Sequence, residues 1–318
     1  MELEVMSLDF ILQAQDNIKL PEHPGSTLRG AFGHGLKTVA CNLKDEKCKE
    51  CNLNNNCAYS LLFNPFLVGK EKEKTSKRFN NKPRPFVFEP VGNGGIVKVG
   101  EKIEFKLNLF GYTKKFLPYI IEAWKQLEKE GIGVGRGEFI VEKIWSGNKI
   151  TGNKNRIFSN EFGYNNAQQI TISNEDLEKF KSILDKKRLQ LKFSSPTLLK
   201  NKGDFVEKID FYKLMKNLFR RLSSLSVFYG EEELDIKFHQ YLEQAKEVKL
   251  AKDTTRWKSW YRYSNRQNKK IKMKGLVGEV VYQGDLEPFL PYLILGQYTH
   301  VGKNTVFGLG NYKLISNT

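Results

Sequence analysis

The sequence predicts an α+β fold built from two similar halves in tandem, each running strand-helix-strand-strand-helix-strand. Three observations predict it. Strand-like and helix-like segments alternate in the same order in both halves. Each half has a glycine-rich loop before its last strand, GIGVGRGEFIVEKI at 131–144 and VGKNTVFGLGNYKL at 301–314. The length of 318 residues, with 40% apolar residues, suits two medium-sized domains with real cores.

The first half opens with a strand, LEVMSLDFILQ at 3–13, followed by a helix, STLRGAFGHGLKTVA at 26–40. A strand is expected near 85–90. KIEFKLNLFGY at 102–112 alternates apolar and polar residues as a half-buried strand does.

The second helix of this half is expected to begin with Thr113 as its N-cap and to end at Gly131. An apolar stripe at helical spacing supports it, formed by Phe116, Ile120, Trp124 and Leu127. The glycine-rich loop and the last strand follow.

The second half repeats this order. A strand at 189–199, LQLKFSSPTLL, precedes a long helix at 210–230. Strands are expected at 250–264 and at 274–284, KGLVGEVVYQG. The last helix lies in DLEPFLPYLILGQ, which begins at Asp285. We expect Asp285 to cap this helix, because a proline as early as the one in DLEP is tolerated only near a first turn.

The order of elements in both halves is that of the ferredoxin-like, or RRM-like, βαββαβ domain. We therefore predict an N-terminal domain at 1–150, a C-terminal domain at 186–318, and a junction at 151–185 that is rich in polar residues. A four-cysteine insertion at 41–57 interrupts the first domain.

Positive charge is in excess along the chain. Lysine and arginine total 52 against 36 acidic residues, which gives a net charge of +16. Such an excess is typical of proteins with a polyanionic partner, and the alternative is solubility in a lysine-rich proteome. No run of 18 apolar residues indicates a membrane span, and MELEVMSLDF alternates like a strand rather than a signal peptide. We expect a cytoplasmic protein that does not contact membranes.

The four cysteines, Cys41, Cys48, Cys51 and Cys57, follow the spacing C-x6-C-x2-C-x5-C. In a cytosolic chain this is a poor disulfide framework, whereas a Cys-x2-Cys pair with two flanking cysteines suits tetrahedral zinc. Four protein ligands close such a site, so we predict a structural zinc without a catalytic role. The alternatives are unligated cysteines or, less favoured, an iron–sulfur cluster.

A basic and aromatic segment lies at 249–274, KLAKDTTRWKSWYRYSNRQNKKIKMK. It holds ten lysines and arginines, one acid, two tryptophans and two tyrosines. Cations neutralise phosphates, and aromatic faces stack on unpaired bases. Core packing would explain some of the aromatic residues, Trp260 above all, but not the ten cations. The segment therefore predicts a nucleic-acid-binding surface.

The C-terminal glycine-rich loop does not match a nucleotide-phosphate loop. A Walker loop needs G-x4-G-K-[ST] between a strand and a helix, whereas here a helix precedes the loop and a strand follows it. The spacing of Gly302, Gly308 and Gly310 also differs. Glycines still allow close approach of a ligand, and backbone N–H groups with Lys303 could hold a phosphate chain. A polymer suits the net charge better than a nucleotide does.

Both ends of the chain resemble a known family. LPEHPGSTLRGAFGHGLKTVAC at 20–41, the cysteine cluster and CAYSLLF at 57–63 resemble the N-terminal half of CRISPR precursor-RNA-processing endoribonucleases. WYRYSNRQNKKIKMKGLVGEVVYQGDLEPFLPYLILGQYTHVGKNTVFGLGNYKL at 260–314 resembles their C-terminal half, glycine-rich loop included. The family belongs to the RAMP superfamily (repeat-associated mysterious proteins).

The resemblance implies two tandem ferredoxin-like domains and cleavage of CRISPR precursor RNA within its repeats, with no catalytic metal or cofactor. In that reaction the RNA 2′-hydroxyl attacks the adjacent phosphate and leaves a 2′,3′-cyclic phosphate and a 5′-hydroxyl. This chemistry needs a base, an acid and cations for the developing charge. The implied partner is CRISPR repeat RNA, single-stranded or folded as a hairpin, and beyond it a CRISPR effector complex. The chain is expected to act as a monomer or a homodimer.

His34 is the first candidate for acid or base. On the helix at 26–40 it lies nearly opposite the apolar stripe and beside Gly30 and Lys37. The glycine would let an RNA backbone approach, and Lys37 would stabilise the phosphate. The resemblance places a catalytic histidine in or near this helix. The alternative is an ordinary exposed histidine.

His300, at the start of the C-terminal glycine-rich loop, is the rival or the partner of His34. A base-and-acid pair requires that the fold bring both rings to one phosphate. Tyr59 and Arg29 are reserve candidates. The residues predicted to bind RNA are basic, aromatic, amide or loop glycine residues: Arg29, Arg256, Trp257, Lys258, Arg262, Asn265, Arg266, Lys269, Lys270, Gly302, Lys303, Gly308 and Gly310.

Two other functions stay open. The chain could be a non-catalytic RAMP subunit that holds guide RNA in a CRISPR interference complex, since some family members lack the catalytic histidine. It could also be a zinc-bearing RNA-binding regulator outside CRISPR systems, which leaves the paired glycine-rich loops unexplained. A small-molecule enzyme is disfavoured, because no paired carboxylates, nucleophile elbow or catalytic metal spacing stands out.

Overall fold

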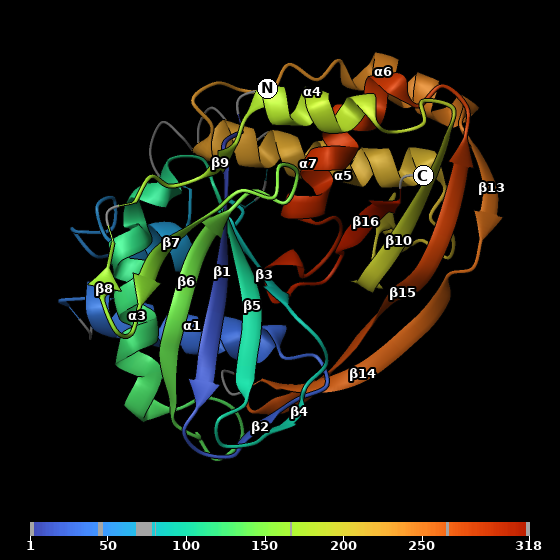
Figure 1. Cartoon of the computed structure of the whole chain (residues 1–318). Coiled ribbons are helices and arrows are strands. Elements are labelled where there is room, and N and C mark those ends of the chain that lie inside the picture. The colour runs from blue at the N-terminus through green and yellow to red at the C-terminus, as the bar shows by residue number, and fades with distance from the viewer. Residues whose placement is uncertain are drawn as a thin grey trace. The chain divides into compact units, whose positions relative to one another are not determined.

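The structure is a computed structural model that describes residues 3–43, 47–67, 78–79, 81–165, 167–264 and 267–315 (Figure 1). The chain forms two compact units. The first unit comprises Glu2–Thr171 together with Ser224–Glu233, and the second comprises Ile172–Ser223 together with Leu234–Thr318.

The first unit contains an antiparallel sheet with the strand order β3-β5-β1-β6-β7-β8. These strands are β1 (Val5–Ala14), β3 (Phe86–Pro90), β5 (Lys102–Phe110), β6 (Phe139–Gly147), β7 (Lys154–Ser159) and β8 (Gly163–Tyr164). Its main helices are α1 (Gly25–Ala40) and α3 (Leu117–Glu130). The smaller elements are β2 (Ile18–Leu20), β4 (Gly95–Val97), β9 (Thr171–Ile172), a π-helix η1 (Tyr59–Phe63) and a 3-10 helix η2 (Gly111–Phe116). The order β1-α1-β3-β5-α3-β6 with β1 and β5 central confirms the predicted ferredoxin-like arrangement.

Trp124 of α3 lies at the centre of this unit's core and is fully buried. Its ring centroid is 4.8 Å from that of Phe105, 5.8 Å from that of Phe10 and 6.2 Å from that of Phe88. Alternation along β1, β3 and β5 directs these three rings to one face of the sheet. Aromatic packing therefore fixes the position of α3 on the sheet. It also fixes the position of Glu130, the last residue of that helix.

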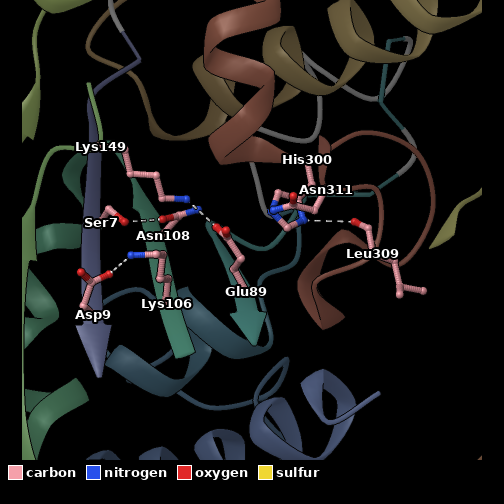
Figure 2. Close-up of polar contacts among 9 residues, drawn as sticks. All are labelled: Ser7, Asp9, Glu89, Lys106, Asn108, Lys149, His300, Leu309 and Asn311. Atoms are coloured by element: carbon pink, nitrogen blue, oxygen red, sulfur yellow. Dashed lines mark hydrogen bonds and ion pairs between the residues drawn. The ribbon is translucent and has the colours of Figure 1, made fainter. Parts of the chain in front are cut away.

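The opposite face of the same sheet carries polar pairs (Figure 2). Ser7 Oγ donates to Asn108 Oδ1 at 2.7 Å, and Asp9 is ion-paired with Lys106 directly across the strands. Lys154 Nζ lies 2.8 Å from the other carboxylate oxygen of Asp9. Burial raises the pKa of Asp9, but the hydrogen bonds and charges of the two lysines outweigh it, so that this pKa lies below its ordinary value.

Lys149 follows β6 and belongs to the same polar face (Figure 2). Its Nζ lies 2.7 Å from Glu89 Oε2, and burial lowers the pKa of Lys149 although the carboxylate opposes the shift. These polar side chains of the face are thus paired with one another.

The segment Ser224–Glu233 completes the first unit, although it lies far along the chain. The Tyr229 hydroxyl donates to the Pro83 carbonyl at 2.5 Å, and the Phe228 ring lies 5.7 Å from the Phe79 ring. Gly111 has φ +62°, and a Cβ there would lie 1.7 Å from the Tyr229 carbonyl oxygen. The glycine therefore lets the returning segment approach the backbone after β5.

The second unit contains a sheet with the strand order β13-β15-β10-β16, and β14 also pairs with β15. These strands are β10 (Arg188–Thr197), β13 (Lys249–Asp253), β14 (Arg256–Ser264), β15 (Lys269–Gln283) and β16 (Tyr312–Ile315). The helices are α4 (Asn174–Ser182), α5 (Phe211–Tyr229, its residues to 223 in this unit), α6 (Phe238–Glu247) and α7 (Leu290–Thr299). A two-stranded hairpin, β11 (Lys200–Asn201) with β12 (Asp204–Phe205), and the 3-10 turns η4 (Glu287–Phe289) and η5 (Thr305–Phe307) complete it. This order confirms a second ferredoxin-like domain.

Two buried tyrosines connect the layers of the second unit. The Tyr312 hydroxyl donates to the Leu293 carbonyl at 2.8 Å, and the Tyr282 hydroxyl donates to the Ile209 carbonyl at 2.6 Å. Burial raises the pKa of both hydroxyls well above its ordinary value. A Cβ at Gly296 would lie 1.9 Å from the Tyr312 oxygen, so α7 needs glycine where it crosses β16.

Two predicted helix starts are wrong. Residues 111–116 form the 3-10 helix η2, in which Thr113 Oγ1 donates to the Phe110 carbonyl at 2.8 Å, and α3 begins only at Leu117. Similarly, η4 precedes α7, and Asp285 pairs with Lys187 at 3.1 Å instead of capping a helix. In contrast, Gly131 ends α3 with φ 67°, as predicted.

The segment predicted as a junction, 151–185, contains β7, β8, β9 and α4. β7 pairs with β6 and extends the first sheet, and the two compact units divide after Thr171. No helix in the described part of the chain is long and apolar enough to cross a membrane.

Candidate active site

His34 lies on the open side of α1, and 55% of its side chain is exposed. Leu28, Phe32 and Leu36 are buried on the other side of the helix. One turn before His34, Gly30 is exposed, and a Cβ added there would meet nothing within 4 Å. The strip around His34 is therefore open to the backbone of a long ligand.

The glycines on both sides of His34 are explained by packing. A Cβ at Gly33 would lie 2.0 Å from the Phe63 ring, and one at Gly35 would lie 2.3 Å from the Ala123 carbonyl oxygen. Helix α1 thus lies with its backbone against α3. This close approach brings the His34 side chain within reach of Glu130, the last residue of α3.

His34 Nε2 lies 2.6 Å from Glu130 Oε2. The other carboxylate oxygen of Glu130 accepts a hydrogen bond from Gln126 Nε2 at 3.4 Å. Because a carboxylate only accepts hydrogen bonds, Nε2 carries a proton, and the neutral ring keeps its lone pair on Nδ1. The pair can therefore take up or release one proton at Nδ1 while Glu130 holds the orientation of the ring.

Arg29 and Tyr59 lie around the Phe63 ring. The Arg29 guanidinium carbon is 3.9 Å from the ring centroid, and the Tyr59 ring stacks on Phe63 with centroids 5.4 Å apart. Burial raises the pKa of the Tyr59 hydroxyl, the neighbouring thiols add to the shift, and Arg29 opposes it. Tyr59 therefore stays protonated at neutral pH and can donate a hydrogen bond but not act as a base.

The four cysteines are half-buried free thiols. Cys57 Sγ lies 3.6 Å from the Ala40 carbonyl oxygen, at the end of α1. Among the described residues, which leave out 44–46, no three His, Cys, Asp or Glu side chains are arranged to hold a metal ion. The described thiols do not by themselves form a tetrahedral set, so the zinc site stays a prediction drawn from spacing.

His300 is completely buried. Its Nε2 accepts a hydrogen bond from Asn311 Nδ2 at 2.9 Å, and its Nδ1 donates to the Leu309 carbonyl at 3.2 Å (Figure 2). Both ring nitrogens therefore have hydrogen-bond partners within the 301–311 loop. This geometry supports a structural role for His300, and its catalytic role stays a prediction drawn from the sequence.

The glycines of this loop also serve its own packing. Gly302 has φ +93°, and a Cβ there would lie 2.5 Å from the Leu198 carbonyl oxygen. Gly310 has φ +75°, and a Cβ there would lie 1.9 Å from the Val301 carbonyl oxygen. Gly308 is buried with φ 83°. The space beside Gly302 and Gly310 is filled by protein backbone rather than open to a ligand, whereas Lys303 is exposed.

The predicted RNA-binding segment forms most of the β14–β15 hairpin. Arg256, Trp257, Lys269 and Lys270 are exposed, whereas Lys258 is half-buried, as is Trp260, which was expected in the core. The Arg262 guanidinium lies 5.0 Å from the Phe307 ring centroid. Asn265 and Arg266 lie outside the described residues.

Two residues that sequence reasoning did not select stand out in the structure. Glu130 is recognisable in sequence only as an acid at the end of a helix, with no sign that it meets His34. Phe205 is 43% exposed on the short β11–β12 hairpin, in a stretch without strand periodicity.

Two parts of the chain match models of known protein families. Residues 191–312 match the family model described as CRISPR-associated endoribonuclease Cas6, and residues 3–171 match a second model, described as an N-terminal domain. The C-terminal part of the chain thus carries the Cas6 endoribonuclease domain of RAMP-type proteins. The two models together span most of both units.

A curated relative matches part of the chain. Over 114 residues this chain is 31% identical to an uncharacterised protein of Archaeoglobus fulgidus. The match covers 36% of this chain and 37% of that protein. The match thus spans little more than a third of the relative's own length.

Solved Cas6 structures share the fold of this chain. Thermus thermophilus Cas6 gives a TM-score of 0.54 at 13% identity, covering 99% of this chain and 100% of that one. A product complex of that Cas6 gives 0.58 at 12% identity, covering 98% and 100%. A partial Cas6-RT-Cas1–Cas2 complex gives 0.61 at 12% identity, covering 99% of this chain and 46% of that one. At this level of identity the likeness shows the fold alone.

Proposed function

We propose that this chain cleaves CRISPR precursor RNA within its repeats by metal-independent attack of the RNA 2′-hydroxyl on the adjacent phosphate. The products are a 2′,3′-cyclic phosphate and a 5′-hydroxyl. The observation that carries the proposal is His34, exposed on α1 and oriented by Glu130, in a chain whose residues 191–312 match an endoribonuclease family model.

Two protons move in this reaction. One leaves the 2′-hydroxyl as it attacks, and one reaches the 5′-oxygen as the bond between phosphorus and that oxygen breaks. His34 carries one of these transfers through Nδ1, as base or as acid. Lys37, one turn along α1, stabilises the charge that develops on the phosphate oxygens.

The choice of His34 over His300 rests on access. A general acid or base must come within hydrogen-bond reach of the proton that it transfers. More than half of the His34 side chain is exposed, whereas His300 is buried and uses both ring nitrogens within its own loop.

RNA binding is supported by charge and by the hairpin. The net charge is +16, and β14 with the first part of β15 carries many cations and no carboxylate. Phosphate neutralisation by such cations gives affinity that falls with salt concentration. We place the implied partner, CRISPR repeat RNA, on this hairpin and at α1.

The test is cleavage of the host's repeat RNA by pure protein in excess EDTA. A control RNA carries a 2′-deoxy residue just before the cut, and product ends are identified by mass spectrometry. We expect cleavage of the normal RNA alone, with cyclic phosphate ends. His34→Ala should lower kcat by about 10²- to 10⁴-fold, the usual contribution of an acid or base. His239→Ala, which removes an exposed histidine on α6, is the matched control and should leave kcat unchanged.

Tight binding without cleavage would replace this proposal by a non-catalytic RAMP subunit that holds guide RNA. Equal cleavage of the 2′-deoxy control, or a requirement for added metal, would overturn the mechanism. An unchanged kcat in His34→Ala would remove His34 from it.

A further inference from the structure

The hairpin of β14 and β15 has two different faces. Nine pairs align in register, from Arg256 opposite Val277 to Ser264 opposite Lys269. Side chains alternate between faces along each strand. Trp257, Tyr261 and Tyr263 are 43%, 66% and 56% exposed, whereas Lys258, Trp260 and Arg262, which alternate with them along β14, are half-buried. We call the side that carries these three rings the outer face.

Lysines share the outer face with the aromatic rings. Lys274, Lys272 and Lys270 of β15 are exposed and lie directly across from Ser259, Tyr261 and Tyr263 of β14. Directly opposed residues of an antiparallel pair lie on the same face. The outer face thus alternates rings and cations along its length.

A separate hairpin extends this surface. The Lys274 Nζ lies 5.0 Å from the ring centroids of both Trp257 and Phe205. Lys200 Nζ lies 4.9 Å from the Phe205 ring. Phe205 of β12 therefore continues the row of aromatic rings past the base of the β14–β15 hairpin, with a cation on each side.

The spacing of the rings separates single strands from duplexes. Residues two apart on a strand lie about 7 Å from each other. Bases stacked within a helix are about 3.4 Å apart and are covered by their neighbours. Tyr261 and Tyr263 can therefore stack only on bases of an extended, unpaired strand, and the lysines between them can meet its phosphates.

We propose that the outer face, formed by Phe205, Trp257, Tyr261, Tyr263 and Lys270, Lys272 and Lys274, is a stacking platform for unpaired RNA, so that this chain binds its repeat as a single strand rather than as a hairpin. The proposal rests on the proposed function, because it specifies the form of the RNA that the chain cleaves. Arg262, which faces Phe307, does not belong to the platform.

The test measures binding by fluorescence anisotropy, with full-length His34→Ala protein so that the RNA stays intact. The probes are an oligouridine of about 12 nucleotides and a blunt RNA duplex of the same length. We expect the oligouridine to bind at least about tenfold more tightly than the duplex, because stacking needs free base faces. Tyr261→Leu/Tyr263→Leu should weaken oligouridine binding at least about tenfold and leave duplex binding unchanged.

Matched variants complete the experiment. Phe162→Leu/Tyr164→Leu removes two exposed rings outside the platform and should change neither affinity. Replacing the three platform lysines by glutamine should reduce the slope of log affinity against log salt by about 2, since each phosphate contact with a single strand contributes about 0.7. Circular dichroism melts show whether each variant is folded.

Equal or tighter binding of the duplex, or an unchanged oligouridine affinity in the tyrosine variant, overturns the platform. Cleavage by wild-type protein is scored separately. Normal cleavage by wild-type protein, together with an unchanged oligouridine affinity in the tyrosine variant, overturns the platform alone. Platform-dependent binding without cleavage overturns the proposed function alone.

Discussion

His34 on α1 and Glu130 at the end of α3 are joined by a hydrogen bond of 2.6 Å, although 96 residues separate them in the chain. The bond depends on Gly35, where the α1 backbone lies against the carbonyl of Ala123. A glycine that packs two helices together thus determines the orientation of an exposed imidazole.

Glu130→Gln should lower kcat for RNA cleavage roughly tenfold with little change in KM, because a neutral amide replaces a charge-assisted hydrogen bond. The measurement is single-turnover cleavage, with ¹⁵N NMR of the His34 ring to follow its tautomer. Glu122→Gln, an exposed change on the same helix, is the control. An unchanged kcat together with an unchanged His34 spectrum would contradict a positioning role for Glu130.

His300→Ala should destabilise the second unit by about 2–4 kcal/mol, because it removes a buried ring and leaves the Asn311 amide without its acceptor. Cleavage per folded molecule should stay the same. Urea unfolding and active-fraction kinetics check the two statements. Full stability combined with lost cleavage would restore His300 to the catalytic machinery.

Gly310→Ala and Gly135→Ala are a matched pair. Both glycines have positive φ, but the added Cβ meets the Val301 carbonyl at Gly310 and nothing within 4 Å at Gly135. We expect about 1 kcal/mol of lost stability at Gly135 and more than about 3 kcal/mol at Gly310, because backbone strain is common to both and the clash is not. Thermal melts compare them. Equal losses would show that conformation alone requires the glycines.

Asp9→Asn should reduce stability near neutral pH and flatten its loss in acid. The pKa of Asp9 is lowered in the folded state, so its contribution to stability is present above the unfolded pKa of about 3.9 and is lost as pH falls through the lower folded value. Urea unfolding at a series of pH values measures the difference between wild type and variant. A difference that does not shrink as the pH is lowered through this window would contradict the linkage.

The cysteine spacing predicts about one zinc per chain. Elemental analysis of protein purified without chelator measures it, and Cys48→Ser/Cys51→Ser should abolish it. Since ligation would draw the four thiols together, zinc removal should loosen the 41–57 segment in hydrogen exchange. Metal-free wild-type protein, or iron in place of zinc, would refute the assignment.

The ferredoxin-like order could be read from the sequence because its strands alternate and its helices carry apolar stripes. The positions of Thr113 and Asp285 were misjudged because cap residues look alike before an α-helix and before a 3-10 turn. Both helices in fact start after such a turn.

The site was harder to predict. Local periodicity was enough to show that His34 faces away from the apolar stripe. The partner of His34 could not be found, because it depends on how closely two helices pack. The burial of His300 had no local signal either, since a titratable residue beside glycines and a lysine looks the same whether its partners are solvent or the carbonyl of Leu309.

The outer face of the hairpin could be predicted from the sequence only in part. The sequence showed rings and cations together, but strand register decides which of them share a side. Pairing of β14 with β15 places Tyr261 with Lys272 and removes Arg262 from that surface.

The return of Ser224–Glu233 to the first unit bears on how genes for such chains can be rearranged. The two halves look like tandem cassettes, yet a cut after Thr171 would leave the first without Phe228 and Tyr229, and Phe79 and Pro83 without their partners. Recombination that exchanged only the N-terminal half would therefore join a sheet to another parent's stabilising segment. Working chimaeras are expected only where Tyr229 and the glycine that receives it, Gly111, come from compatible parents.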